Sequence, residues 1–184
     1  MALTESNMLA LGTQAPDFSL PDTVSGETLS LSELQSDIAT VVMFICNHCP
    51  YVIHLNSKLV EVAEAYQTKG VSFIAISSND VNTHPEDGPE QMAIVADRED
   101  YPFPYLYDET QAVAKAYTAA CTPDFFIFDK AMKCAYRGRF DETRPRMGEP
   151  TGEDLSAALD ALIAGEAVPE RQYPSMGCNI KWKQ

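Results

Sequence analysis

Basic residues are scarce in this chain of 184 residues, which holds 13 lysines and arginines against 27 aspartates and glutamates. The formal net charge is −14 and the sequence pI is about 4.4. Such a charge repels the phosphates of nucleic acids and the anionic surface of membranes. The composition therefore predicts neither nucleic acid nor a membrane as a partner, and it favours a freely soluble chain.

Targeting and cofactor-binding segments are also missing. No apolar run approaches the length of a membrane span, and residues 1–7 do not resemble a secretory signal. The chain has no glycine-rich phosphate loop and no flavin or nicotinamide fingerprint. We therefore expect a cytoplasmic protein without a bound cofactor. In that compartment, spaced cysteines are more often catalytic or metal-binding than structural.

The most informative segment that is present is Cys46-Asn47-His48-Cys49-Pro50. The β-branched and apolar residues 39–45 before it are typical of a buried strand. After it, apolar residues recur at steps of three and four, which is typical of a helix with one apolar face. These residues are Val52, Leu55, Leu59, Val62 and Tyr66. Two thiols are therefore expected where a strand ends and a helix begins.

This position favours redox chemistry. Unpaired backbone N–H groups and the helix dipole stabilise an anion there, so we expect a thiolate at Cys46. A thiolate with a second thiol close by can attack a disulfide and then be released by its neighbour. The hypothesis is a Cys46–Cys49 redox couple, in which Cys46 attacks and Cys49 resolves the mixed disulfide.

Two other interpretations of the motif are open. A structural zinc site needs a second ligand pair, whereas the remaining cysteines stand singly at Cys121, Cys134 and Cys178. Both cysteines of the motif could instead be small buried hydrophobic residues. The strand–CxxC–helix context favours the redox interpretation over both.

Strands and helices alternate along the chain, which predicts a single α/β domain over residues 1–184. We expect strands over 39–45, 71–77, 125–128 and 133–137, and helices over 47–69, 91–100, 110–119 and 153–164. Residues 17–20 and 28–31 flank a turn and predict a short hairpin. The segment 79–89 is rich in proline, glycine and polar residues and is expected to be a loop.

Three blocks of sequence carry a family resemblance. They are LGTQAPDFSL at 11–20, GETLSLSEL at 26–34, and Thr122-Pro123 followed by Asp124-Phe125-Phe126-Ile127. Their order and spacing resemble the redoxin group, or AhpC/TSA-like family, over about residues 10–165. The C-terminal tail, 166–184, is similar to that of a peroxiredoxin-like subgroup. The resemblance implies a thioredoxin-like fold, with a central mixed β-sheet flanked by helices and an N-terminal β-hairpin.

The resemblance also implies site residues. In thioredoxin-type members, the cysteine that ends the strand is the nucleophile and its partner resolves, which maps onto Cys46 and Cys49. Thr122-Pro123 matches the segment that carries a cis-proline facing the CxxC. We therefore expect a cis bond there and a Thr122 backbone free to pair with an extended substrate. Cys121 adjoins this segment, and Cys178 could reach it only if the tail folds back; both are candidate accessory thiols.

His48 resembles the histidine that precedes the second cysteine in protein disulfide isomerases. A protonated imidazole close to Cys46 would stabilise its thiolate and make the disulfide easier to reduce. We expect the Cys46–Cys49 couple to be more oxidising than that of thioredoxin, whose reduction potential is about −270 mV. Thioredoxin keeps a buried aspartate six residues before its nucleophile. Thr40 stands there in this sequence, so no carboxylate is expected at that position to repel the thiolate.

The sequence thus predicts a thiol–disulfide oxidoreductase that acts on protein or small-molecule disulfides and thiols, with a thiol reductant as partner. One alternative is a thiol peroxidase using Cys49, because that position matches the peroxidatic cysteine of peroxiredoxins. The family's peroxidases also use an arginine, for which Arg137 and Arg139 could substitute only if the fold brings them to the site. Another alternative is a thiolate carrier of Cu(I) through Cys46 and Cys49, joined by Cys121.

Overall fold

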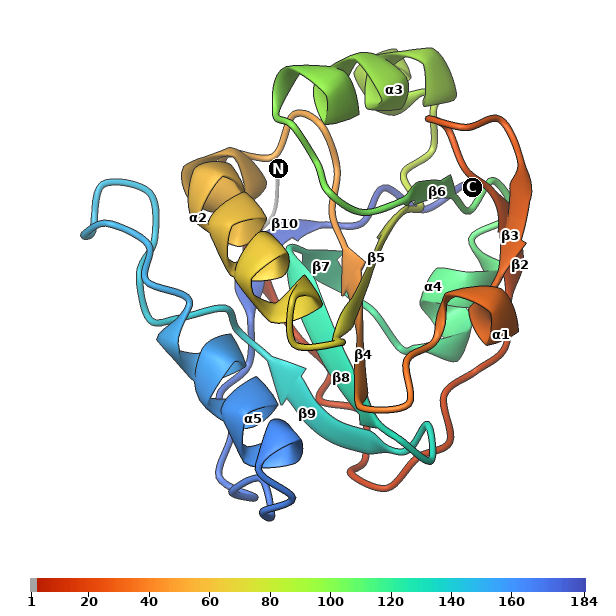
Figure 1. Ribbon diagram of the computed structural model, residues 1–184. Helices are drawn as coiled ribbons and strands as arrows, with labels where there is room; N and C mark the ends of the chain where they lie inside the picture. The colour runs from red at the N-terminus through yellow and green to blue at the C-terminus, as the bar shows by residue number, and fades with distance from the viewer. Residues whose placement is uncertain (1–2) are drawn as a thin grey trace.

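The structure is a computed structural model that describes residues 3–184, and a five-stranded sheet forms its centre (Figure 1). The sheet order is β6-β5-β4-β8-β9. Its strands are β4 (Ala39–Phe44), β5 (Ser72–Ser77), β6 (Tyr105–Tyr107), β8 (Asp124–Asp129) and β9 (Cys134–Gly138). Strands β4, β5 and β6 run parallel, whereas β8 and β9 are antiparallel to their neighbours. This mixed sheet confirms the predicted fold class.

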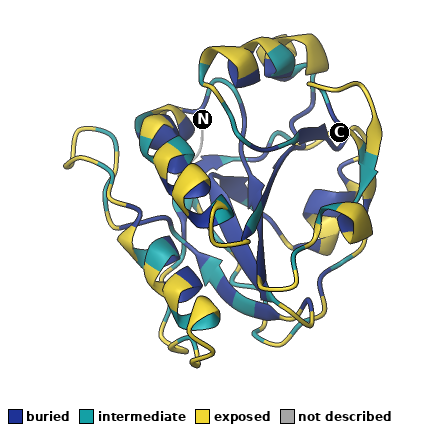
Figure 2. Ribbon diagram, viewed as in Figure 1, coloured by how far each residue is buried: buried dark blue, intermediate teal, exposed yellow. Residues whose placement is uncertain are grey.

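Both faces of the central sheet are buried, as the dark strands in Figure 2 show. Along β4, Val41 and Met43 join one hydrophobic cluster, while Val42 and Phe44 join the other. The first cluster includes residues of α2 (Pro50–Gln67), α3 (Pro89–Arg98) and α5 (Glu153–Ile163), and the second includes residues of α1 (Leu31–Leu34) and α4 (Ala112–Ala116). Burial on two faces explains why the strand sequences are almost continuously apolar.

Most of the predicted elements are present, with changes at their ends. The hairpin forms from β2 (Ser19–Pro21) and β3 (Thr28–Ser30). The helix expected over 47–69 begins only at Pro50, because proline has no N–H to lose at the first helical position. The helix expected over 110–119 shrinks to α4, because Gln111 takes a left-handed conformation. Over residues 3–184, no helix has both the length and the apolar character needed to cross a membrane.

Several short elements have no clear signal in the sequence. The strand β6 has only three residues, and Tyr101-Pro102-Phe103-Pro104 before it hides its pattern. A 3-10 turn, η1 (Pro85–Asp87), lies inside the loop expected over 79–89. Such short segments are formed by tertiary contacts more than by local periodicity.

A second sheet brings the C-terminal tail back onto the domain. It has the order β1-β10-β7, formed by β1 (Leu3–Glu5), β10 (Met176–Asn179) and β7 (Cys121–Thr122). Figure 1 shows β10 beside β7, close to the start of α2. The antiparallel register places Cys178 opposite Thr122. The tail therefore folds back, which was the condition for Cys178 to reach the site.

Gly177 allows β10 to approach β7 this closely. A Cβ atom added to Gly177 would lie 1.9 Å from the carbonyl oxygen of Thr122 and 3.3 Å from Cδ of Pro123. No side chain fits at a distance of 1.9 Å from a backbone oxygen. Glycine is therefore required at position 177 by the pairing itself.

Substitution of Gly177 tests this contact. Gly177→Ala should lower the free energy of unfolding by about 1–3 kcal/mol, because the added methyl group must push Thr122 away from β10. Chemical denaturation measures the change. Glu5→Ala, at an exposed position of the same sheet, is the control and should change stability by less than about 0.5 kcal/mol. Equal unfolding midpoints for Gly177→Ala and the wild type would show that β10 does not lie this close to Thr122.

Candidate active site

The two thiols of the CxxC motif lie between the end of β4 and the start of α2, as the sequence predicts. Cys46 follows β4, and Cys49 is the N-cap of the 18-residue helix α2. Cys46 is 1% exposed and Cys49 is fully buried. All five cysteines of the chain are thiols in this structure. Both thiols therefore lie at the junction of β4 and α2, and both are buried.

Thr122 faces both thiols. The Thr122–Pro123 bond is cis, which confirms the prediction. Thr122 Oγ1 lies 3.4 Å from Cys46 Sγ, and the Thr122 carbonyl oxygen lies 3.2 Å from Cys49 Sγ. The expectation that the Thr122 backbone is free to pair with a substrate is wrong for this structure, because β10 already pairs with it.

A third thiol completes the cluster. Cys178 Sγ lies 2.8 Å from Cys49 Sγ, and Cys178 is 5% exposed. Cys121, the other candidate accessory thiol, directs its sulfur to the carbonyl oxygen of Pro123 at 3.6 Å, and burial raises its pKa. Cys134 belongs to the hydrophobic cluster that contains neither Cys46 nor Cys49. The structure thus assembles Cys46, Cys49 and Cys178.

The directions of the pKa shifts favour a charge on Cys49 over one on Cys46. A hydrogen bond from Cys46 is the main cause that lowers the pKa of Cys49 to about 5, although burial acts in the opposite direction. The thiol and the backbone N–H of Cys178 lower this pKa further. Since Cys49 is also the residue at the helix N-terminus, the helix dipole acts in the same direction.

Cys46 is held in its neutral form. Its hydrogen bond with Cys49 is the main cause that raises the pKa of Cys46 well above the usual range, followed by burial and by the charge of Asp87. The thiolate expected at Cys46 stays a prediction, which these directions of the pKa shifts disfavour for the reduced site. Its premise was that the helix begins next to Cys46, whereas α2 begins at Pro50.

His48 lies close to Cys46 and to a buried carboxylate. His48 Nδ1 is 2.7 Å from Asp87 Oδ2, and the Asp87 side chain is 0% exposed. Asp87 also accepts hydrogen bonds from the Asn47 backbone N–H at 2.9 Å and from Asn79 Nδ2 at 2.8 Å. The His48 ring stacks on His84, with centroids 5.4 Å apart. Thr40 has no carboxylate, as the sequence shows. The carboxylate of Asp87, which belongs to η1, lies beside His48 instead.

One group of side chains could hold a metal ion. The ligand atoms of Cys46, His48 and Asp87 lie within 4.8 Å of one another. A thiolate, an imidazole and a carboxylate together suit a borderline transition metal more than Cu(I), which prefers sulfur. For the Cu(I) alternative, the third thiol in contact with the motif is Cys178, in place of the expected Cys121.

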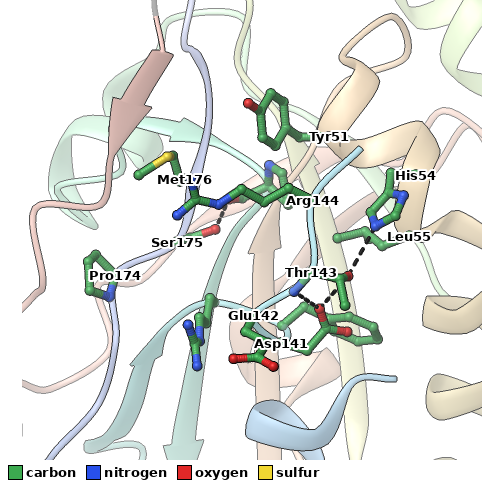
Figure 3. A pocket seen from close by; sticks show the side chains of 13 residues that line it. Tyr51, His54, Leu55, Asp141, Glu142, Thr143, Arg144, Pro174, Ser175 and Met176 are labelled. Carbon is green, nitrogen blue, oxygen red and sulfur yellow. Dashed lines mark hydrogen bonds between the residues drawn. The ribbon is translucent and has the colours of Figure 1, made fainter. Parts of the chain in front are cut away.

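A surface pocket borders the cis-proline. Tyr51 and His54 of α2 line one side, and Arg144 and Met176 face them across it (Figure 3). His54 is fixed there by a contact of 3.0 Å between its Nε2 and the Thr143 hydroxyl. Among the described residues that line this pocket, none is a cysteine. The pocket thus reaches the edge of the dithiol cluster without opening onto a sulfur.

Comparison with known proteins gives one family and several similar structures. The sequence profile of the AhpC/TSA family matches residues 11–137. An uncharacterised conserved protein from Geobacillus kaustophilus is 59% identical, with a TM-score of 0.97 over 100% of this chain and 97% of that one. A hypothetical protein from Sinorhizobium meliloti is 45% identical, with a TM-score of 0.95 and 98% of each chain covered.

A more distant structure extends the comparison. A candidate thioredoxin from Neisseria meningitidis is 26% identical, with a TM-score of 0.63 over 80% of this chain and 88% of that one. No curated protein matches the chain. The fold that these structures share is thioredoxin-like, which agrees with the fold expected from the sequence.

The lowered pKa of Cys49 gives a pH-dependent signal. The reduced protein should gain ultraviolet thiolate absorbance as the pH rises through about 5. Cys49→Ser should lose this transition, and Cys46→Ala should move it to higher pH, because the main stabilising hydrogen bond is gone. Cys134→Ser is the control and should leave it unchanged. A transition that survives Cys49→Ser but disappears in Cys46→Ala would place the thiolate on Cys46.

Proposed function

The chain belongs to the AhpC/TSA family of thioredoxin-fold oxidoreductases, and we propose that it exchanges disulfides through a Cys46–Cys49 couple. The observation that carries this proposal is the position of the dithiol. Cys49 caps α2, Cys46 follows β4, and Thr122 of the cis peptide contacts both sulfurs. A paired thiol and thiolate facing a cis-proline suit attack on a disulfide.

The first step uses the thiolate of Cys49. It attacks one sulfur of a substrate disulfide, the substrate S–S bond breaks, and the other substrate sulfur leaves as a thiolate. A mixed disulfide between Cys49 and the substrate results. The lowered pKa of Cys49 supplies the nucleophile across the neutral pH range.

The second step uses Cys46. Once Cys49 is in a mixed disulfide, it carries no charge, so the main cause that raises the pKa of Cys46 is removed. Cys46 then loses its proton, attacks the Cys49 sulfur and releases the second substrate thiolate. His48, which has a ring nitrogen within 4.8 Å of the Cys46 sulfur and of an Asp87 carboxylate oxygen, accepts the proton. Two electrons pass from the dithiol to the substrate, and a thiol reductant reverses the change.

The partners follow from this chemistry. We propose small-molecule or protein disulfides as substrates and a thiol as the reductant, in a reducing compartment such as the cytoplasm. Peptides long enough to pair with Thr122 would have to displace β10 first.

Peroxide reduction by Cys49 is the second candidate function. It is favoured by the lowered pKa of Cys49, because a peroxidatic cysteine must be a thiolate. The family's peroxidases use an arginine that this sequence lacks near Pro123, and the two arginines that could replace it bind other groups. Arg137 Nε donates to the Leu9 carbonyl, and Arg139 Nε lies 2.6 Å from Asp154 Oδ2. Peroxide turnover by a Cys46→Ser variant would favour this candidate over disulfide exchange.

Cysteine variants test the two roles. Cys49→Ser should lose exchange with glutathione disulfide by on the order of 100-fold or more, because the nucleophile is removed. The double variant Cys46→Ser/Cys178→Ser should accumulate a mixed disulfide between Cys49 and glutathione, which mass spectrometry detects. Cys134→Ser is the matched control and should behave as the wild type. Trapping through Cys46 in the Cys49→Ser variant would reverse the roles, and full activity in both variants would exclude the couple.

The reduction potential tests the role of His48. We expect the couple to lie above the thioredoxin value of about −270 mV. His48→Ala should lower it by tens of millivolts, where about 30 mV corresponds to 1.4 kcal/mol, because Asp87 then faces the thiols unpaired. A titration in glutathione buffers measures the potential, with His54→Ala, whose side chain contacts Thr143, as the control. Equal potentials for His48→Ala and the wild type would show that His48 has no influence.

A further inference from the structure

The strand β10 lies where an extended substrate would reach the dithiol. Thr122 contacts both sulfurs of the motif, so a segment that pairs with Thr122 is held against them. In this structure that segment is the chain's own tail, with Cys178 opposite Thr122 in antiparallel register. A substrate strand would present its cysteine in the same manner. The tail thus imitates a substrate.

The contact between Cys178 and Cys49 is close enough for chemistry. The two sulfurs lie 2.8 Å apart, although the residues are 129 positions apart in the sequence. A disulfide has an S–S length of about 2.05 Å, so a movement of less than about 1 Å would join them. Because both residues are buried, neither sulfur is open to solvent. The Cys178 sulfur therefore faces the Cys49 sulfur and is shielded from thiols in solution.

The tail is fixed on both sides of Cys178. Before it, the Ser175 hydroxyl donates to the Pro123 carbonyl at 2.5 Å. After it, the Lys181 backbone N–H donates to Asn79 Oδ1 at 2.8 Å. Asn79 in turn donates to Asp87, the carboxylate beside His48. The glycine required at position 177 adds a third constraint. These contacts build β10 into the site and fix Cys178 against the dithiol.

We propose that Cys178 is a third redox-active thiol, which takes over the disulfide from Cys46–Cys49 and forms a Cys49–Cys178 bond. The proposal rests on the proposed function, which supplies the Cys46–Cys49 disulfide. Cys178 loses its proton and attacks the Cys49 sulfur; the Cys46–Cys49 bond breaks and the Cys49–Cys178 bond forms. Cys46 leaves as a thiolate and takes up a proton. One S–S bond replaces another, with no net oxidation.

Oxidation of the dithiol prepares Cys178 for this step. In the reduced site, burial and then contact with Cys49 raise the pKa of Cys178 to about 12, so it remains a thiol. Formation of the Cys46–Cys49 disulfide removes the negative charge at Cys49. The contact with Cys49 then no longer raises the pKa of Cys178. Lys181 already acts to lower the pKa of Cys178. The third thiol therefore gains reactivity only after the couple has been oxidised.

The relayed disulfide would change access to the site. A Cys49–Cys178 bond ties β10 covalently to the start of α2, so β10 can no longer leave Thr122 to admit a peptide. Cys46 regains its thiol at the same time. The oxidised chain would thus be closed to extended substrates until a small thiol reduces the bond, and the tail would act as a gate that responds to the redox state.

Disulfide mapping in a Cys46→Ser variant tests the proposal. Of the five cysteines in the sequence, this variant keeps four. Treatment with one equivalent of diamide, followed by alkylation under denaturing conditions, should reduce the count of alkylated thiols from four to two in the monomer. Peptide mass spectrometry should identify Cys49 joined to Cys178. The double variant Cys46→Ser/Cys178→Ser should keep all of its thiols. Four alkylated thiols in oxidised, folded Cys46→Ser would overturn the proposal.

The wild type and Gly177→Val separate this proposal from the proposed function. The oxidised wild type should contain both Cys46–Cys49 and Cys49–Cys178, whereas Gly177→Val, which pushes β10 away, should contain only Cys46–Cys49. A wild type that exchanges disulfides and yields Cys46–Cys49 alone would overturn the relay and leave the proposed function standing. A wild type that forms no disulfide at Cys46 or Cys49 would overturn both. Cys134→Ser is the control and should match the wild type.

Discussion

The antiparallel pairing of β10 with β7 is the contact on which the arrangement of the site depends. It covers the dithiol, brings the Cys178 sulfur to 2.8 Å from Cys49, and occupies the backbone of Thr122. The pairing is possible only because position 177 has no side chain. Without it, Cys49 would lose two of the groups that lower its pKa, the thiol and the backbone N–H of Cys178. The tail is therefore part of the site in both geometry and electrostatics.

A single negative charge organises the reduced cluster. Three buried thiols cannot all ionise in a medium of low polarity, and the directions of their pKa shifts favour a charge on Cys49 over one on Cys46 or Cys178. Asp87 opposes a charge on Cys46, and His48 lies close to both. Any reaction that removes the charge from Cys49 makes the other two thiols easier to ionise. The same coupling thus provides the second step of exchange and the proposed relay.

The sequence predicted the features that are encoded locally. Apolar periodicity located β4 and most of α2, and the family resemblance located the cis bond at Pro123. The thiolate expected at Cys46 stays a prediction, and the helix start from which it was argued lies at Pro50, three residues later than expected.

The remaining features depend on contacts between distant segments. Asp87 reaches His48 from a loop without periodicity, and nothing in that loop's composition marks it. The residues of β10 do not alternate in polarity, and its partner β7 has only two residues. Pairing between such short segments is decided by packing and by the space at Gly177, which a single sequence does not reveal.

A redox titration of the intact chain tests the central claim most directly. The reduced protein would be equilibrated in glutathione buffers over a range of potentials, quenched with acid, alkylated and mapped by peptide mass spectrometry. The account predicts one reversible two-electron transition, in which two thiols disappear and every disulfide formed contains Cys49. A chain whose five cysteines all remain alkylatable at every potential, or whose disulfides leave out Cys49, would contradict it.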